Sequence, residues 1–175
     1  MGKIFVFPSA VAQYYAPSDL SGVHGMHRER IRSTESWSKG PERRDCVFVV
    51  HSDDLPGLRG MDIAQVKLLF KIEVPKQRGR HIRYYPCALV SWFSVIGDEP
   101  CPDTGMWRVE PDFDQKGDRS MSIVHLEAIL RGAHLIGVAN DEFLPHQLKH
   151  TDSLTSFRAF HVNRFIDYHA HEILS

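Results

Sequence analysis

The sequence predicts an α+β fold: a small antiparallel β-barrel or sandwich with an N-terminal arm and a C-terminal helix. Three observations support this class. Short runs rich in β-branched and aromatic residues are separated by clusters of Gly, Pro and Asp, as in small all-β domains. One run alternates apolar and polar residues with a period of two. After Asp118, apolar residues instead recur at three- and four-residue spacing, which favours a helix.

Length and composition fit a single domain. The chain has 175 residues, 42% of them hydrophobic and 25% charged, a balance that allows one buried core. We expect an N-terminal arm over 1–44, a β-barrel core over 45–140 and a C-terminal helical appendage over 141–175. The arm contains many Pro, Gly and Ser residues and only brief apolar pieces.

Four runs are the expected strands of the core. The first, 45–50, is apolar and closed by a turn cluster, and the second, 64–74, carries the period-two pattern. The third spans 84–96, and Pro86 confines its start to a sheet edge or a bulge. The fourth, 106–109, lies between two turn clusters.

Three further elements are expected after these strands. Apolar residues at three- and four-residue spacing predict a short helix over 123–130, which Gly132 would end. The apolar run 134–138 predicts a closing strand. A cap-like Thr-Asp-Ser sequence and the phenylalanines after it predict a C-terminal helix over 153–168.

Cysteine usage and hydropathy indicate an intracellular protein, nuclear or cytoplasmic. The three cysteines, Cys46, Cys87 and Cys101, are odd in number and far apart, which argues against a disulfide framework. No stretch approaches the roughly 18 apolar residues of a membrane span, and no cleavable leader is evident. We therefore expect no membrane partner.

The formal net charge of −1 hides a strong asymmetry along the chain. Residues 59–83 hold seven Lys or Arg against two acids, whereas 98–118 holds seven acids against two bases. Within the basic stretch, a Pro- and Gly-marked turn joins the second and third strands. Its predicted phosphate-contacting side chains are Lys76, Arg78, Arg80 and Arg83.

Aromatic residues beside this basic turn are candidate recognition residues. Tyr84, Trp92 and Trp107 could stack on bases next to the arginines. The alternative is that they fill the core of a small barrel, since aromatic side chains bury large areas.

A second set of arginines lies in the arm. They are Arg28, Arg30, Arg32, Arg43 and Arg44. Acidic residues are interleaved with them, among them Glu29 and Asp45, so the local excess of positive charge is small. We expect either phosphate contacts or a solvated surface here.

Metal binding is weighed because the chain has 11 histidines. His146 and His150 are four apart, as two ligands on one helix face would be, and His169 and His171 form a second group. No complete ligand motif occurs, so we expect no metal and no other cofactor. The alternative is a metal-dependent hydrolase or nuclease that combines these histidines with an acidic loop at 112–118, whose first carboxylates are Asp112 and Asp114.

The chain contains eight longer phrases: YAPSDLSG (15–22), RERIRST (28–34), DCVFV (45–49), GMDIAQV (60–66), YPCALVSWF (85–93), TGMW (104–107), SIVHLEAILRGAHLI (122–136) and FRAFHVNRFIDYHAHE (157–172). Together these phrases resemble the closing, C-terminal region of large basidiomycete transposase-like proteins of the Plavaka/KDZ kind. The resemblance implies that the nuclease carboxylates belong to a preceding catalytic domain and that this region is an accessory module. A chain with Met1 directly upstream of this region departs from the long family pattern, and it is either a stand-alone descendant or an excised piece.

Together these observations predict an accessory module that binds nucleic acid or chromatin weakly, without strong sequence preference and without catalysis of its own. Two alternatives stay open. One is the metal-dependent hydrolase. The other is a protein-interaction or oligomerisation domain that uses the C-terminal phenylalanines Phe157, Phe160 and Phe165.

Overall fold

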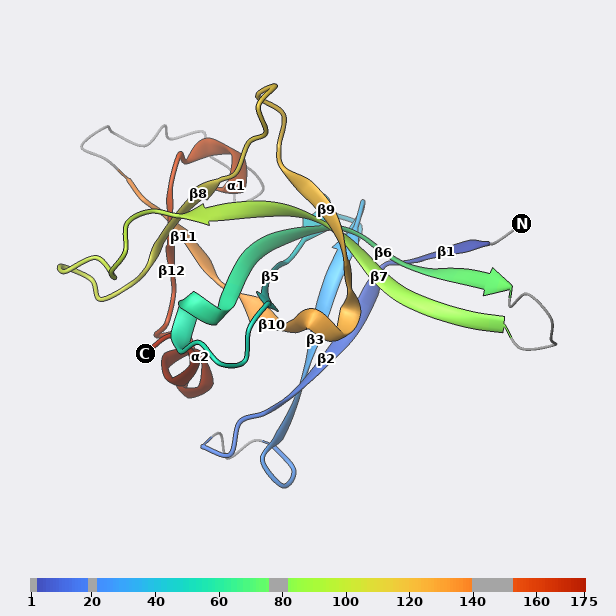
Figure 1. The fold of residues 1–175 in the computed structure, drawn as a ribbon, viewed down its shortest axis with the longest axis horizontal. Coiled ribbons are helices and arrows are strands. Elements are labelled where there is room, and N and C mark those ends of the chain that lie inside the picture. Colours follow the sequence, from blue (N-terminus) through green and yellow to red (C-terminus); the bar gives the residue numbers. More distant parts are fainter. Residues whose placement is uncertain (1–2, 19–21, 76–81, 140–152) are drawn as a thin grey trace.

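The computed structural model describes residues 3–18, 22–75, 82–139 and 153–175. These residues form two antiparallel sheets and a few short helices (Figure 1). The larger sheet has the strand order β10-β5-β6-β7-β8-β12-β11, with β1 also paired to β6 and β9 also paired to β7. The smaller sheet has the order β2-β3-β4.

The strand bounds show that the sheets draw on all three segments expected as arm, core and appendage. The larger sheet consists of β1 (Ile4–Phe7), β5 (Cys46–Val50), β6 (Met61–Pro75), β7 (Ile82–Val95), β8 (Arg108–Pro111), β9 (Met121–His125), β10 (Ile129–Ala133), β11 (Leu135–Gly137) and β12 (Phe160–Val162). The smaller sheet consists of β2 (Ser9–Tyr15), β3 (Met26–Thr34) and β4 (Arg43–Arg44). The helical pieces are η1 (Gly57–Gly60), η2 (Leu126–Ala128), α1 (Ser153–Ser156) and α2 (Tyr168–Ile173).

The larger sheet is nearly closed as a barrel. Its first and last strands, β10 and β11, are consecutive in the chain, separated by His134 alone. The run Ile129–Gly137 therefore pairs with β5 through one half and with β12 through the other. This arrangement confirms the predicted small β-barrel with a C-terminal helix.

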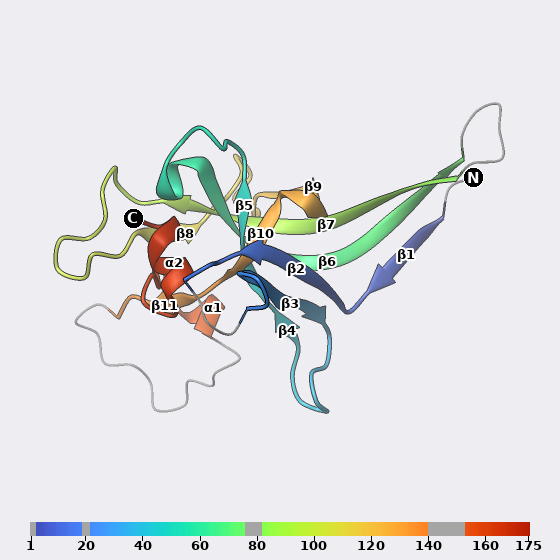
Figure 2. The same ribbon diagram turned by 90° about the horizontal axis from the view of Figure 1, so that it is seen from below.

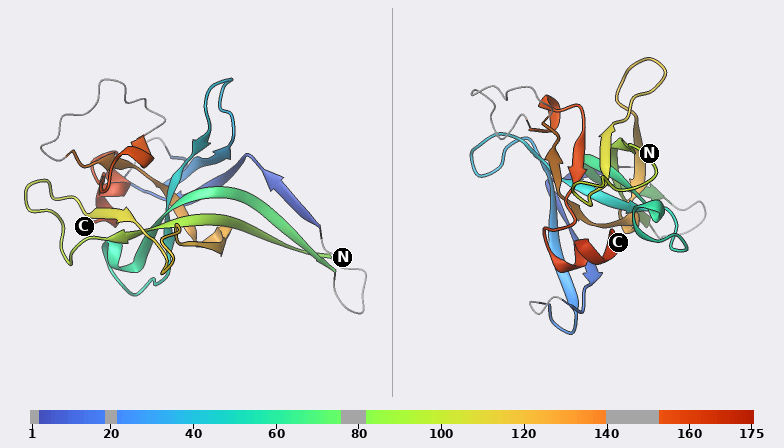
Figure 3. Two further views of the ribbon diagram at one scale, coloured as in Figure 1. Left: turned by 90° about the horizontal axis from the view of Figure 1, so that it is seen from above. Right: turned by 90° about the vertical axis from the view of Figure 1, so that its left-hand side faces the viewer.

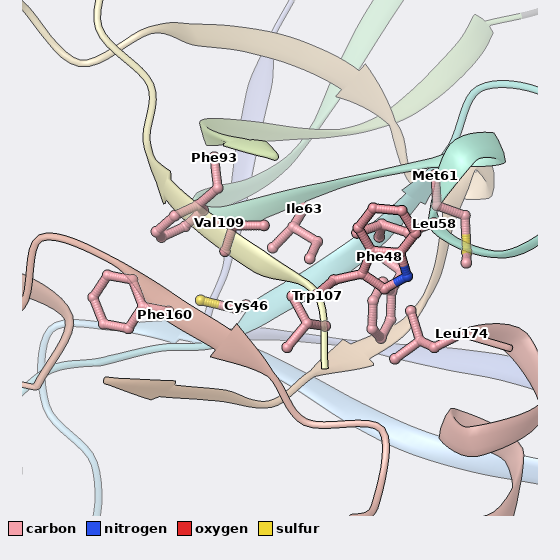
Figure 4. Close-up of a cluster of buried hydrophobic side chains, with 11 residues drawn as sticks. Cys46, Phe48, Leu58, Met61, Ile63, Phe93, Trp107, Val109, Phe160 and Leu174 are labelled. Atoms are coloured by element: carbon pink, nitrogen blue, oxygen red, sulfur yellow. The ribbon is translucent and has the colours of Figure 1, made fainter. Parts of the chain in front are cut away.

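Two groups of buried side chains fill the interior. One lies between β5, β6, β8 and β12 and is drawn in Figure 4; it includes Phe48, Ile63, Trp107 and Val109. Phe93 and Phe160 pack edge to face in the same cluster, with ring centroids 5.8 Å apart. The other group gathers small and β-branched residues of β5, β6 and β7 under the β2–β3 hairpin.

Strands β6 and β7 extend well beyond the barrel as a two-stranded ribbon with β1 along one side (Figures 1 and 2). The two strands pair from Ile63 and Phe93 out to Pro75 and Ile82. The ladder between β7 and β9 ends at Cys87. Pro86 thus lies just beyond that ladder, where its missing N–H costs no β9 hydrogen bond, as expected from its position near a strand start.

The predicted helix over 123–130 is wrong. This segment forms β9, the short 3-10 turn η2 and then β10. The apolar residues do not share one buried face: Ile123 is exposed on β9, opposite Leu89 of β7, whereas Ile129 is buried. Pairing with β7 and β5 overrides the three- and four-residue spacing, and Gly132 lies inside β10.

The predicted helix over 153–168 is also wrong in its extent. Only the first turn forms as α1, and Phe160–Val162 is strand β12, paired with both β8 and β11. Phe160 and Val162 are buried while His161 between them is half-buried, which is the alternation of a strand. The C-terminal helix α2 begins after Asp167, whose carboxylate accepts a hydrogen bond from Ala170 N–H at 2.7 Å.

The segment expected as an arm forms strands. Its hairpin, β2 and β3, pairs from Ser9 and Arg32 to Tyr15 and Met26 and lies against β10. Across the described ranges, no helix has the length and apolar character needed to cross a membrane.

Candidate nucleic-acid interface

Strand β3 carries an arginine at every second residue from Arg28 to Arg32, so three successive positions of its outer side are arginines. Side chains on a strand alternate between the two faces of the sheet. Arg28 and Arg30 are exposed and Arg32 is half-buried, whereas Ile31 and Ser33 between and after them are buried. Neighbouring arginines on this side are therefore about 6.7 Å apart along the strand.

The neighbouring strands extend this surface without adding acid. Across β2, the three arginines face Gln13, Val11 and Ser9, and residues paired in this way point to the same side of the sheet. On the other side of β3, Arg43 of β4 lies opposite Thr34. We call this surface the arginine face. Its members are Arg28, Arg30, Arg32, Arg43 and Trp37.

Trp37 joins the arginine face through two guanidinium groups. The Arg32 guanidinium lies 4.4 Å and that of Arg43 5.5 Å from the centroid of its ring. The side chain is nevertheless 42% exposed, so part of the ring is open to a ligand. Guanidinium stacking of this kind holds the ring in place near the arginines.

Among the described residues, Asp45 is the carboxylate that hydrogen-bonds to this face. Its Oδ1 accepts from Arg43 Nε at 2.8 Å, and its Oδ2 accepts from the Arg32 backbone N–H at 2.8 Å. The Arg28, Arg30 and Arg32 side chains make no ion pair with a carboxylate in the part of the chain described. Arg30 instead donates to Ser9 Oγ at 3.0 Å, and Arg32 to the Arg30 carbonyl at 3.2 Å.

An open cavity of about 450 Å³ follows the β3 side of this surface. Its lining includes Arg28, Arg30, Arg32 and Arg43, the carboxylates Glu29 and Asp45, and on the other side Gly132 of β10 with His134 after it. A chain of phosphates could run along the outer side of β3, away from these two carboxylates, with its charges near successive arginines.

Glu29, which separates two of these arginines in sequence, points to the opposite side of the hairpin. Its Oε2 accepts from Gly132 N–H at 2.9 Å and lies 3.8 Å from Arg131 Nε. A side chain at Gly132 would collide with this carboxylate, because an added Cβ would lie 2.7 Å from Glu29 Oε1. The acid that seemed to cancel the arginines in the sequence therefore bonds on the opposite side of the hairpin, where it is half-buried.

A buried group around Arg131 fastens the hairpin to the barrel and to α2; we call it the Arg131 cluster. Arg131 is 4% exposed and donates to both carboxylate oxygens of Asp167, at 2.8 and 2.5 Å. It also donates to His169 Nδ1 at 3.2 Å. The Tyr14 ring stacks on His169 with centroids 4.7 Å apart and lies 4.9 Å from the guanidinium.

Burial and charge shift two pKa values in the Arg131 cluster. Burial, and after it the positive charge of Arg131, lowers the pKa of His169. Burial alone would raise the pKa of Asp167, but the hydrogen bonds from Arg131 and Ala170 and the charge of Arg131 outweigh it. The net effect is a lowered pKa for Asp167. The cluster is thus arranged for a neutral imidazole and an ionised carboxylate.

Of the predicted phosphate-contacting residues, Arg83 is the one that the structure describes, and it is separate from this surface. Lys76, Arg78 and Arg80 lie outside the described residues. Arg83 is exposed on β7, opposite Val74 near the end of the ribbon. The ribbon projects away from the barrel, whereas the β2–β3 hairpin runs along the barrel's side (Figure 3).

The three predicted recognition aromatics do not form one surface. Trp107 is buried in the core, as the alternative interpretation held. Trp92 is half-buried and donates from Nε1 to Ser122 Oγ at 2.8 Å. Tyr84 is exposed on the ribbon, where its ring lies 4.7 Å from Lys71 Nζ.

The candidate metal-ligating histidines are only partly described by the structure, and the two that are described lie apart. His146 and His150 lie outside the described residues. His169 is buried against Tyr14, whereas His171 is exposed and lies 3.2 Å from an Arg164 guanidinium nitrogen, so these two do not converge. Across the described ranges, no three of His, Cys, Asp and Glu come together as metal ligands would.

The acidic loop forms a hydrogen-bonded turn. Asp114 Oδ1 accepts from the backbone N–H of Lys116 at 2.8 Å and of Asp118 at 3.0 Å. Asp112 lines a separate open cavity of about 710 Å³ that also includes Arg119.

Among the cysteines, Cys46 and Cys87 are buried free thiols, and burial raises the pKa of Cys46 to about 12. Neither has the electropositive, accessible setting of a nucleophile.

Sequence reasoning noted the arm arginines but did not separate the two sides of β3. The signal was present: in Arg28-Glu29-Arg30-Ile31-Arg32 an arginine recurs at every second position. Counting charge by segment adds Glu29 to the same sum, whereas strand alternation places it on the other face.

Comparisons of the chain with protein-family models, with curated proteins and with solved structures gave no match.

Proposed function

We propose that this chain is a non-catalytic accessory module that binds nucleic acid through the arginine face. One observation carries the proposal: strand alternation gathers Arg28, Arg30 and Arg32 on the outer side of β3, while the carboxylate of Glu29 turns the other way and binds Gly132 N–H. An accessory role agrees with what the resemblance to the closing region of transposase-like proteins implies. The same chemistry would serve for naked nucleic acid and for the DNA of chromatin.

The arginine face suits a phosphate backbone for two reasons. Guanidinium groups bind phosphate oxygens bidentately and stay charged at every physiological pH. Their regular spacing along a rigid strand is close to the spacing of successive phosphates in a nucleic acid strand. Contacts of this type carry no base information, so binding is expected to be weak and tolerant of sequence, with a Kd of about 10⁻⁴ to 10⁻⁶ M at physiological salt.

Trp37 adds a surface for an unpaired base. An exposed tryptophan ring beside arginines is the arrangement that stacks bases in proteins that bind single strands. Because a base in a duplex is already stacked, this contribution favours single-stranded segments. We therefore expect single-stranded DNA or RNA to bind more tightly than duplex of equal length at equal salt.

Titration of fluorescently labelled duplex and single strands at several salt concentrations tests the proposal. With about three phosphate contacts, log Kobs should fall against log salt with a slope of about −2.7 for duplex and about −2 for single strands. If neither form binds at low salt, or if affinity is independent of salt, the proposed function is wrong.

A further inference from the structure

The ribbon formed by β1, β6 and β7 exposes an unusual amount of apolar surface. Its large apolar side chains that are 39–65% exposed are Ile4, Phe5, Val6, Phe7, Val74, Ile82, Tyr84 and Tyr85. Single exposed apolar residues are common on proteins, but so many on one projection are unusual. Strand alternation divides them between the two faces of the ribbon, with Phe5, Phe7, Ile82 and Tyr84 on one face and Ile4, Val6, Val74 and Tyr85 on the other. The ribbon leaves the barrel as a separate projection (Figure 3), so the barrel core does not explain these residues.

Strand β1 is an edge of the sheet. It pairs with β6 on one side, and in the part of the chain described it pairs with no other strand. Neither Lys nor Pro lies within Ile4–Phe7 to discourage further pairing, and every residue of the strand is exposed. Such a strand is a template for the addition of another strand.

The hydrogen bonds to β6 identify which backbone groups of β1 point outward. Glu73 N–H donates to the Lys3 carbonyl at 2.8 Å, so this pair is hydrogen-bonded. Bonded and non-bonded pairs alternate in an antiparallel ladder, and Ile4 pairs with Ile72 in the next position. The N–H and C=O groups of Ile4 and Val6 therefore point away from β6.

We propose that two copies of the chain pair through β1, antiparallel about a two-fold axis that passes beside Phe5. In this register Ile4 of each copy lies opposite Val6 of the second copy, and Phe5 lies opposite Phe5. All the outward N–H and C=O groups of Ile4 and Val6 are then paired in both copies. The two ribbons become one continuous sheet. This inference is independent of the proposed nucleic-acid binding.

The symmetric register centred on Val6 is worse. Centring the axis on Val6 would place Ile4 opposite Pro8 of the second copy, which has no N–H to donate. In the proposed register, Lys3 instead lies opposite Phe7 of the second copy, where a cation can approach the ring. Phe5 and Phe7 already attract the Lys71 ammonium, at 5.0 and 5.6 Å from their centroids.

The surface available to this pairing fits a small dimer whose population depends on concentration. Tyr84 and Tyr85 belong to β7, on the far side of β6, so only the side chains of β1 meet the second copy. The exposed parts of those four side chains come to roughly 350 Å² per copy, taking about 175 Å² for each whole side chain. Two copies contribute about 700 Å², the size of a weak, transient interface. A second copy of the same apolar strand is self-complementary, as a two-fold interface requires.

The mass in solution tests the dimer. Light scattering across a concentration series should approach twice the 20.0 kDa of one chain. Ile4→Lys places like charges near the axis and should return the mass to that of a monomer. The matched control is Ile123→Lys, which changes an isoleucine of similar exposure on β9 and should leave the dimer intact. A wild-type chain that stays monomeric, or a dimer lost through Ile123→Lys and kept by Ile4→Lys, overturns the proposal.

Cysteine cross-linking tests the register without weakening the pairing by charge. In a Cys101→Ser background, Phe5→Cys should form an intermolecular disulfide on mild oxidation, because Cα atoms of a non-hydrogen-bonded pair are about 4.5 Å apart. Val6→Cys should not, since its partner is Ile4. Efficient cross-linking through Val6→Cys, or none through Phe5→Cys in a dimer, would contradict the register.

Discussion

Arginines lie on both sides of the β2–β3 hairpin, and their surroundings differ completely. On the inner side, Arg131 is almost fully buried, with Asp167 held by two hydrogen bonds and Glu29 within ion-pair distance. On the outer side, Arg28 and Arg30 are exposed, and Arg30 bonds only a serine hydroxyl among the described residues. The same side chain serves as a structural clamp on one side and as a free charge on the other.

The difference shows how burial and partners separate structural from ligand-binding arginines. Burying a guanidinium costs free energy unless its charge is paired, and this requirement fixes the carboxylates beside it. An exposed guanidinium without a carboxylate keeps its hydrogen-bonding capacity for a ligand. We therefore assign stability to the Arg131 cluster and binding to the arginine face.

The largest expected effect is on stability. Arg131→Ala leaves Asp167 and Glu29 without their shared partner and should lower the free energy of unfolding by about 3 kcal/mol. This loss is at the lower end of the range for broken buried ion pairs because the Asp167 side chain is 33% exposed. The matched control, Arg30→Ala on the outer side, should change the free energy of unfolding by less than about 0.5 kcal/mol. Urea denaturation measures both variants, and equal losses would contradict the assignment of stability to Arg131 alone.

A change of pH should affect the inner side of the hairpin. His169 and Asp167 both have lowered pKa values in the folded protein, so the unfolded chain binds more protons as the pH falls. The contribution of neutral His169 is complete above its ordinary pKa of about 6.5 and is lost as the pH falls through its folded pKa. That of Asp167 is lost only in more acidic solution.

Thermal unfolding between about pH 7.5 and about pH 5.5 checks this expectation, since His169 titrates near this range. The wild-type Tm should fall on acidification. His169→Gln, whose amide oxygen can still accept from Arg131 but cannot titrate, should show a smaller fall. An identical pH dependence of the two proteins would exclude His169 as the titrating group.

The smallest expected effect concerns Trp37 on the outer side. Trp37→Ala should weaken binding of single strands by about 1 kcal/mol, the lower end for loss of one stacked base, because two guanidinium groups already occupy part of the ring. Duplex binding and Tm should change little. Trp37→Phe is the control that keeps a stacking surface. Equal loss for duplex and single strands would show that Trp37 acts only by positioning Arg32 and Arg43.

Local pattern was enough to predict the strands of the barrel core. The alternation in 64–74 and the apolar runs 45–50 and 84–96 correspond to parts of β6, β5 and β7, because their faces are set by burial on a sheet. The segments 123–130 and 153–168 were misassigned as helices, since pairing with distant strands decided their conformation. Such pairing leaves no periodicity that a short segment could reveal.

The candidate site could be predicted only in part for a related reason. Arg28, Arg30 and Arg32 were recognised as possible phosphate ligands, but their grouping depends on β3 pairing with β2 and on Glu29 turning toward Gly132. That contact joins residues 103 positions apart in the chain. A count of charges along a short segment therefore cannot predict it.

The most direct test of the central claim compares two variants with the same change in charge. One replaces three arginines of the arginine face by alanine: Arg28, Arg30 and Arg32. The control replaces three exposed arginines on other elements: Arg59, Arg108 and Arg158. The measurement is the slope of log Kobs against log salt for one labelled single strand.

The account predicts that the slope of about −2 is nearly abolished in the first variant and unchanged in the control, because each lost phosphate contact removes about 0.7 from a single-strand slope. Both variants should keep the wild-type Tm. Equal flattening in the two variants, or an unchanged slope in the first, would show that the arginine face is not the binding surface.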